Sequence, residues 1–262
     1  QDITVRRDMP LLSGMPVGDW AGRSYDIGLD FHDSRGLLSF LAPGMYIADS
    51  TKVKFNITSE GRFSTDVRSS RIAFNGNYLK NFRAEFNNND ENLTGSAIAD
   101  IIHLGNFASL ENSILKMYAD NNRLGVGFQY DNNGELDNRG EIYALGEISR
   151  DEDDDLRLGI RLLPSTIHLN SRRWSIHETE FIVTGDGVEV ESFELNSDEQ
   201  RMSAYGKISK SAADTLSMEL DRFDIGIVNS LMTPNPRLQG KLTGMAMLVS
   251  PIENKSILLD VV

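Results

Sequence analysis

An alternation of apolar and polar residues with a period of two, running through residues 156–249, limits this chain more than any other feature. A period of two is that of a β-strand with one apolar face and one wet face. The first run consists of Leu156, Leu158, Ile160 and Leu162. Turn sequences such as Leu163-Pro164-Ser165 and Gly185-Asp186-Gly187 separate the runs. The stretch therefore predicts a long antiparallel meander in which every strand offers one apolar face.

One segment of this stretch departs from the alternation. Residues 223–232 have apolar side chains at helical spacing, and Pro234 and Pro236 follow them. Because proline cannot continue a helix, this pattern predicts a short helix that ends before the prolines. We expect a strand before this helix, at 216–220, and another after it, at 238–247.

The same order of elements occurs near the start of the chain. Residues 25–31 alternate as a strand, residues 35–41 form a short apolar helical turn before Pro43-Gly44, and residues 51–57 alternate again. The two regions predict an internal repeat spaced by about 190 residues. In both regions we expect the helix to act as a plug on the sheet.

The rest of the chain continues the β pattern. Candidate strands are 79–86, 95–104, 113–118, 124–130 and 140–149. Asn-rich turns separate them, and such frequent turn signals are typical of antiparallel all-β folds. We expect one continuous repetitive sheet over residues 1–262, with a possible subdivision at the acidic turn 151–155.

Composition excludes several classes of function. The chain has 262 residues, a formal charge of −13 and no cysteine. An acidic surface disfavours nucleic acid and anionic lipid surfaces, and disulfides and thiolate metal sites are excluded. No apolar run reaches the length of a membrane span. A start at Gln1 and a strand-like end predict a fragment of a longer chain.

The sequence offers no catalytic constellation. There is no Gly-x-Ser-x-Gly elbow, and none of the four histidines has a partner at metal-ligand spacing. Gly125-Val126-Gly127 lies inside a strand rather than before a helix, which argues against a nucleotide loop. We expect no enzyme, no catalytic residue and no cofactor. The histidines are His32, His103, His168 and His177.

Two segments and two tryptophans can each be interpreted either as a ligand-binding site or as an ordinary structural feature. The acidic turn 151–155 could bind calcium, but a solvated hairpin tip is the favoured interpretation. Residues 131–134 resemble part of an EF-hand loop, but Gln129 and Gly140 stand where such a loop needs acidic ligands, so we expect no metal. Trp20 and Trp174 could stack on sugars, although isolated tryptophans more often pack at a sheet edge.

The repeated apolar face has two interpretations. It could be the filled interior of a closed sandwich or barrel. It could instead line an open groove, and a face of this size would then be covered by acyl chains. The residues predicted to line such a groove are Tyr25, Ile27, Leu29, Phe31, Val53, Phe55, Leu124, Val126, Phe128, Leu156, Leu158, Ile160, Leu162, Phe181, Val183, Leu216, Met218, Leu220, Leu238, Leu242 and Leu248.

The order of several motifs over residues 162–244 resembles the closing region of the TamB and AsmA-like family of Gram-negative envelope proteins, the Bacteroides-type branch most. These motifs are Leu162–Thr166, His168-Leu169-Asn170, Arg173–His177, Leu220–Leu231 and Leu238–Gly244. The resemblance implies an elongated, curled, taco-like β-sheet with an apolar lumen. It also implies a periplasmic location in a protein anchored in the inner membrane by parts outside this chain.

The resemblance further implies a non-enzymatic role. That role is to conduct phospholipid acyl chains between the inner and outer membranes, or to assist assembly of outer-membrane proteins with a barrel partner of the BamA or TamA type. A closed β-sandwich that binds glycan or protein at a surface is the alternative. It predicts a filled core and an aromatic patch near Trp20 or Trp174.

Overall fold

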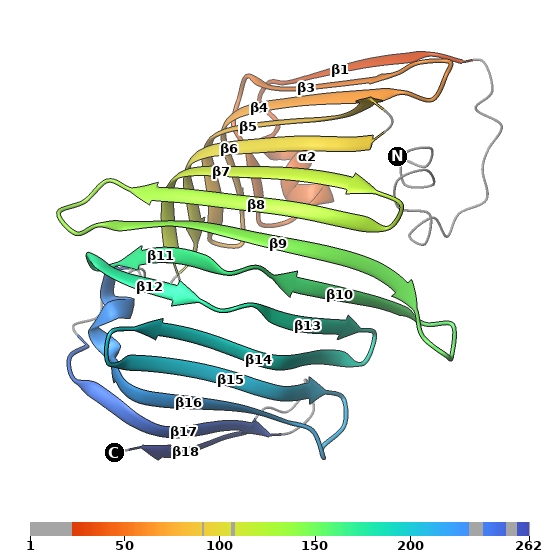
Figure 1. Ribbon diagram of the computed structural model, residues 1–262. Coiled ribbons are helices and arrows are strands. Elements are labelled where there is room, and N and C mark those ends of the chain that lie inside the picture. The colour runs from red at the N-terminus through yellow and green to blue at the C-terminus, as the bar shows by residue number, and fades with distance from the viewer. Residues whose placement is uncertain (1–22, 91, 106–107, 231–237, 250–255, 262) are drawn as a thin grey trace. The chain divides into compact units, whose positions relative to one another are not determined.

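The computed structural model describes residues 23–90, 92–105, 108–230, 238–249 and 256–261, which belong to two compact units. The first unit comprises the described residues up to Asn133, and the second begins at Gly134 (Figure 1). Strands make up 72% of the residues that the structure describes, and helices 4%. All strand pairings within each unit are antiparallel, so the predicted all-β antiparallel fold is confirmed.

The first unit is a meander with one short helix. From β3 to β8 each strand pairs with the next, β1 pairs with β3, and β2 pairs with the far part of β4. Its elements are β1 (Tyr25–Phe31), α2 (Arg35–Leu41), β2 (Met45–Ile47), β3 (Thr51–Ile57), β4 (Phe63–Phe74), β5 (Asn77–Asp90), β6 (Asn92–Leu104), β7 (Ala108–Asp120) and β8 (Arg123–Asn132).

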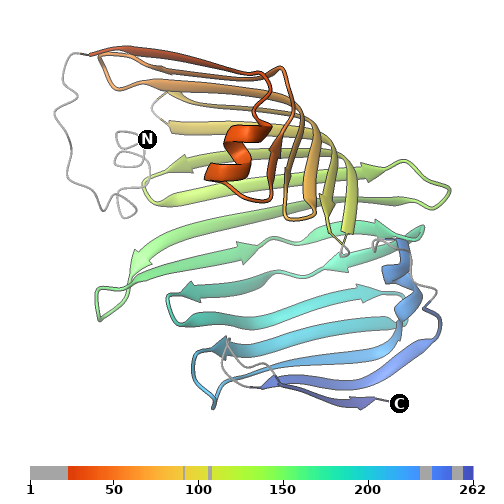
Figure 2. The same cartoon turned by 180° about the vertical axis from the view of Figure 1, so that it is seen from behind.

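The predicted strand, helix and strand near the start of the chain are confirmed at 25–31, 35–41 and 51–57. Helix α2 lies within the connection between two directly paired strands, β1 and β3. It sits on the side toward which β4–β7 bend (Figure 2). Its Phe40 residue is 83% exposed, so this ring is not packed against the sheet.

A line of asparagine and aspartate residues crosses the strands of this unit where they bend. Asn81 in β5 and Asn112 in β7 have positive φ angles, 48° and 45°. The Asn81 amide donates a 2.6 Å hydrogen bond to Asp100 Oδ2, and the Asn112 amide donates one of 2.8 Å to the Asp131 carbonyl. Because left-handed residues interrupt the regular pleat, this line accounts for the bend.

The apolar positions shift by one residue across this bend. On one side, Val67, Ala84, Ala97 and Leu115 are mutual register partners. On the other side, the partners are Ile72, Leu79, Ile102 and Leu110. An ordinary strand would place the second set on the opposite face. In β5 and β7 a left-handed residue, Asn81 or Asn112, lies between the two sets and compensates for this shift.

The second unit has the same meander with a hairpin inserted at one end. Strand β9 pairs with both β10 and β11, β10 also pairs with β13, and β14 to β18 follow in order. Its elements are β9 (Asn138–Arg150), β10 (Leu156–Leu162), β11 (Ser165–Leu169), β12 (Arg172–Ile176), β13 (Thr179–Thr184), β14 (Gly187–Ser197), β15 (Gln200–Ser209), β16 (Thr215–Asp224), η2 (Ile225–Ser230), β17 (Lys241–Val249) and β18 (Ser256–Val261).

Two predicted boundaries in this unit differ from the structure. The helix expected at 223–232 is a 3-10 helix over Ile225–Ser230, because Phe223 and Asp224 still pair with Leu242 and Lys241 and so extend β16. Residues 231 and 232 lie outside the described residues. Strand β17 begins at Lys241 rather than at Leu238, because Lys241 is the partner of Asp224, the last residue of β16.

The acidic turn 151–155 connects the paired strands β9 and β10 inside the second unit. The boundary between the units lies at Asn133–Gly134 instead.

Large side chains form a packed core at one end of the second unit. Trp174 is fully buried, and its ring lies 5.5 Å from that of Phe223. Trp174, Leu169 and Ile227 line one small cavity of about 80 Å³. The Asn170 side-chain amide donates to the Gly226 carbonyl and so ties η2 to this core. Trp174 is therefore a core residue and is not exposed for stacking on sugars. Trp20 lies outside the described residues.

Candidate functional site

Strand register joins the apolar residues of the first unit into one face. Residues directly opposite each other on antiparallel strands lie on the same side of a sheet. One row of partners crosses from β1 to β8 through Ile27, Phe55, Thr65, Phe86, Gly95, Met117 and Val126. The neighbouring row is Leu29, Val53, Val67, Ala84, Ala97, Leu115 and Phe128. We call these two rows the apolar face of the first unit.

The second unit has its own apolar face, built in the same way. Its longest row of partners is Ile160, Phe181, Val190, Gly206, Leu216 and Leu248. A second row is Leu158, Val183, Val188 and Ile208, and shorter rows pair Met218 with Ala246 and Leu220 with Met202. The register shift after Leu220 brings Phe223, not Arg222, opposite Leu242, so the apolar alternation continues past the bulge.

Aromatic rings contact small residues and one another on these faces. A Cβ atom at Gly95 would stand 2.2 Å from the ring of Phe86, so the Phe86 ring covers this glycine. Phe55 and Phe63 have ring centroids 6.2 Å apart, and Phe181 and Phe193 lie 6.5 Å apart. These contacts are among side chains of one face.

The residues predicted to line the groove all lie in the described part of the chain, and none of them is buried. Ile27 is 46% exposed and Leu29 is 50% exposed. Leu156, Met218 and Leu238 are also exposed, and the others are half-buried. The buried apolar residues of the first unit are mainly alanines, and only Ile57 and Tyr130 are larger. This unit thus shows no layer of large side chains packed over its apolar face among the described residues.

The opposite face of the first unit is charged. Lys52 lies 3.7 Å from Asp30, and Arg68 lies 2.9 Å from Asp66 and 3.8 Å from Glu85. The hydrogen bond and the attraction from Asp66 raise the pKa of Arg68 above its usual range. These side chains alternate with the apolar residues along the same strands, so the face that they form is the solvated one.

The structure brings the predicted groove residues together within each unit, with one exception. Leu238 precedes β17 and belongs to no strand. Sequence reasoning missed the contribution of β4–β7, which supply Val67, Phe86, Leu115 and Met117 to the first face. Alternation at 63–67 and 82–86 was the available signal. It is weakened by partners such as Gly95 that carry no apolar side chain.

Leu220 also borders an open cavity of about 440 Å³ over β15–β17. Its lining combines apolar residues, Leu220 and Met245, with polar and charged ones such as Arg201, Glu219 and Thr243. Glu219 accepts a 3.0 Å hydrogen bond from the Tyr205 hydroxyl. This bond and the negative charge of Glu219 raise the pKa of Tyr205. The second unit therefore has a depression beside Leu220 that offers both polar and apolar groups.

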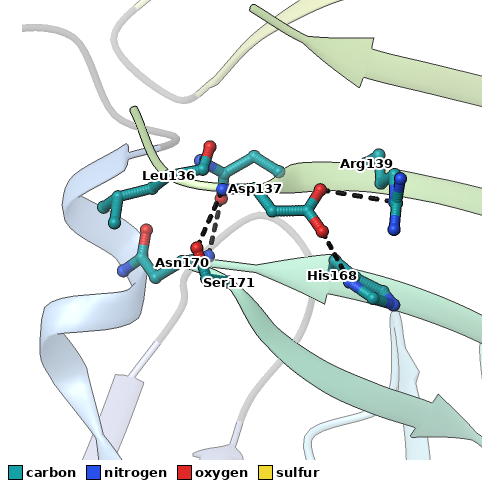
Figure 3. A network of polar contacts seen from close by, with 7 residues as sticks. Leu136, Asp137, Arg139, His168, Asn170 and Ser171 are labelled. Atoms are coloured by element: carbon teal, nitrogen blue, oxygen red, sulfur yellow. Dashed lines mark hydrogen bonds and ion pairs between the residues drawn. The ribbon is translucent and has the colours of Figure 1, made fainter. Parts of the chain in front are cut away.

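His168 belongs to a polar network rather than to the apolar face (Figure 3). Its Nδ1 lies 2.8 Å from Asp137 Oδ2, and Arg139 Nε lies 3.3 Å from the other oxygen of this carboxylate. The backbones of Asp137 and Ser171 also bond, since the Ser171 amide donates to the Asp137 carbonyl at 2.8 Å. The network fastens the turn between β11 and β12 to the residues before β9.

In the acidic turn 151–155, the Asp151 carboxylate accepts hydrogen bonds from the backbone of the turn itself. Asp151 Oδ1 accepts hydrogen bonds from the Asp153 and Asp155 amides, at 3.1 and 2.9 Å. Within the described residues, no group of three or more His, Asp or Glu side chains is arranged to hold a metal ion. The helices described here include none that is both long and apolar enough to cross a membrane.

Comparison with protein-family models, curated proteins and solved structures finds no match for this chain.

Proposed function

We propose that this chain is a periplasmic segment of a TamB/AsmA-like envelope protein and that its apolar faces carry phospholipid acyl chains between the inner and outer membranes. The observation that supports this most is the accessible apolar face of each unit, continuous from strand to strand. Soluble monomers rarely leave large contiguous apolar patches in water. A lipid chain is a partner that matches such a face without polar contacts.

The energetics of acyl chains favour this interpretation. Burying a methylene group contributes about 0.8 kcal/mol, so a chain that lies along one face gains several kcal/mol without a specific hydrogen bond. The rows of the first unit combine aliphatic and aromatic side chains with small residues and contain no charged residue. A face without charged groups holds a chain without fixing its position, which suits movement along the sheet.

The alternative, a closed sandwich that binds glycan or protein, requires a second packed layer. In the first unit the buried apolar side chains are mainly alanines, which are too small to form such a layer. Burial of Trp174 also removes one of the two tryptophans on which a sugar-stacking patch depended.

A phospholipid with a photoreactive diazirine in its acyl chain tests the proposal. After irradiation and proteolysis, we expect labelled peptides at the apolar face, with adducts on Met117, Val126 and Phe128. We expect few adducts on Lys116 and Gln129, which alternate with them. A lipid with the diazirine in its headgroup is the control for non-specific labelling. Equal labelling of both alternating sets would refute the assignment of the apolar face.

Acyl-chain labelling of a variant, combined with an assembly assay in cells, separates the lipid role from assistance in outer-membrane protein assembly. Assembly with a barrel of the BamA or TamA type would use backbone pairing at a sheet edge. Substitution of Val126 by Asp should abolish acyl labelling but leave edge pairing intact. Assembly activity that survives this substitution in cells, with lipid labelling lost, would assign the two roles to different parts of the sheet.

A further inference from the structure

Two like charges lie directly opposite each other in the first unit, beyond the bend of the sheet. Arg71 in β4 and Lys80 in β5 are register partners, and both side chains are exposed. Like charges at directly opposite positions destabilise a sheet. Among the described residues, no carboxylate lies within ion-pair distance of either cation.

A second like-charge pair in the same two strands shows the usual compensation. Arg68 is opposite Arg83, but Asp66 and Glu85 lie close to Arg68. The Arg71–Lys80 pair lacks such neighbours in the described part of the chain. In a protein with a formal charge of −13, this local positive charge stands out.

The Tyr78 ring holds the Arg71 side chain in place. Its guanidinium carbon lies 4.4 Å from the centroid of the Tyr78 ring, and Tyr78 stacks on His103 with centroids 4.5 Å apart. A cation over an aromatic face is attracted by the ring, which restricts its rotamers. Arg71, Lys80, Tyr78 and His103, from three adjacent strands, therefore form one ordered surface that we call the basic patch.

We infer that the basic patch binds a single phosphate-bearing group. The guanidinium fork of Arg71 matches two phosphate oxygens, and Lys80 adds a compact charge on the neighbouring strand. His103 lies at the end of the same stack and offers a further donor when protonated. The acidic charge of the whole chain repels polyanions, so the fitting ligand is one phosphate or phosphate ester, not a nucleic acid. This inference does not depend on the proposed role of the apolar faces.

Histidine NMR tests the inference. The chain has four histidines, and only His103 belongs to the basic patch. We expect sodium phosphate to move the His103 ring resonances saturably, compared with sodium chloride at equal pH and ionic strength. His32, His168 and His177 are internal controls and should move little. Glycerol phosphate, added in a parallel titration, distinguishes the sources: tighter binding than inorganic phosphate indicates a phosphate ester such as a lipid headgroup, and equal binding indicates free phosphate.

Matched variants separate the basic patch from general electrostatics. The double substitution Arg71→Gln and Lys80→Gln should weaken phosphate binding at least tenfold. The control Arg161→Gln and Lys207→Gln removes the same charge from residues paired with Glu178 and Asp214, and it should leave binding unchanged. An equal shift of His103 with chloride, or unchanged phosphate binding in the first variant, would overturn the inference.

Discussion

Matched isoleucine substitutions in adjacent strands should reveal whether the apolar face is covered. Ile27 in β1 belongs to the apolar face and is 46% exposed, whereas Ile57 in β3 is buried at 7%. Threonine is the appropriate replacement at both positions, because it keeps the β-branched shape that strands favour. Only the environment of the two side chains then differs.

The expected costs follow from these exposures. At Ile57, a hydroxyl enters an apolar environment and apolar surface is lost. We expect a loss of about 2–4 kcal/mol in the free energy of unfolding of the first unit. At Ile27, nearly half of the side chain already contacts water, so we expect a loss of about 1 kcal/mol or less.

Urea unfolding followed by circular dichroism measures these losses, and amide hydrogen exchange in β1 and β3 assigns them to the first unit. The reasoning would be wrong if Ile27→Thr cost as much as Ile57→Thr. Such a result would mean that Ile27 lies under a packed layer, as in a closed sandwich.

Three smaller predictions concern glycine, asparagine and tyrosine positions. Gly95→Ala should cost about 1–3 kcal/mol in urea unfolding, because the added methyl meets an aromatic ring, whereas Gly28→Ala, which meets no atom within 4 Å, should cost nothing. Asn81→Val should cost about 1–2 kcal/mol through its positive φ, and a larger loss for Asn81→Gly would contradict the backbone explanation. Since the hydrogen bond and charge of Glu219 raise the pKa of Tyr205, Glu219→Gln should make this phenol ionise at lower pH in a 295 nm titration. An unchanged titration curve would contradict the contact.

The sequence alone was sufficient for the class of fold and for most of the apolar faces. Alternation is a local property, and it placed β1, β3 and β10 correctly because their inward and outward residues differ sharply in polarity. The rows through β4–β7 were harder to predict, since Phe86 lies over Gly95 and this partnership is visible only when the strands are paired.

Features that depend on contacts distant in sequence could not be predicted. Asn81 adopts its positive φ beside Asp100, a partner on the next strand. Trp174 is buried by Phe223 and Ile227, which follow much later in the chain. Leu238 fitted the alternation of Leu242, but pairing with β16 begins only at Lys241.

Native mass spectrometry of the protein purified without detergent, followed by organic extraction, tests the central claim most directly. We expect phospholipid to co-purify with the chain and to be lost in Val126→Asp, Leu216→Asp and Leu220→Asp. Gln129→Asp and Ser217→Asp add the same charge at alternate positions of β8 and β16, and they should retain the lipid. A folded, lipid-free wild-type protein, or equal loss of lipid in both sets of variants, would contradict the claim that these faces carry acyl chains.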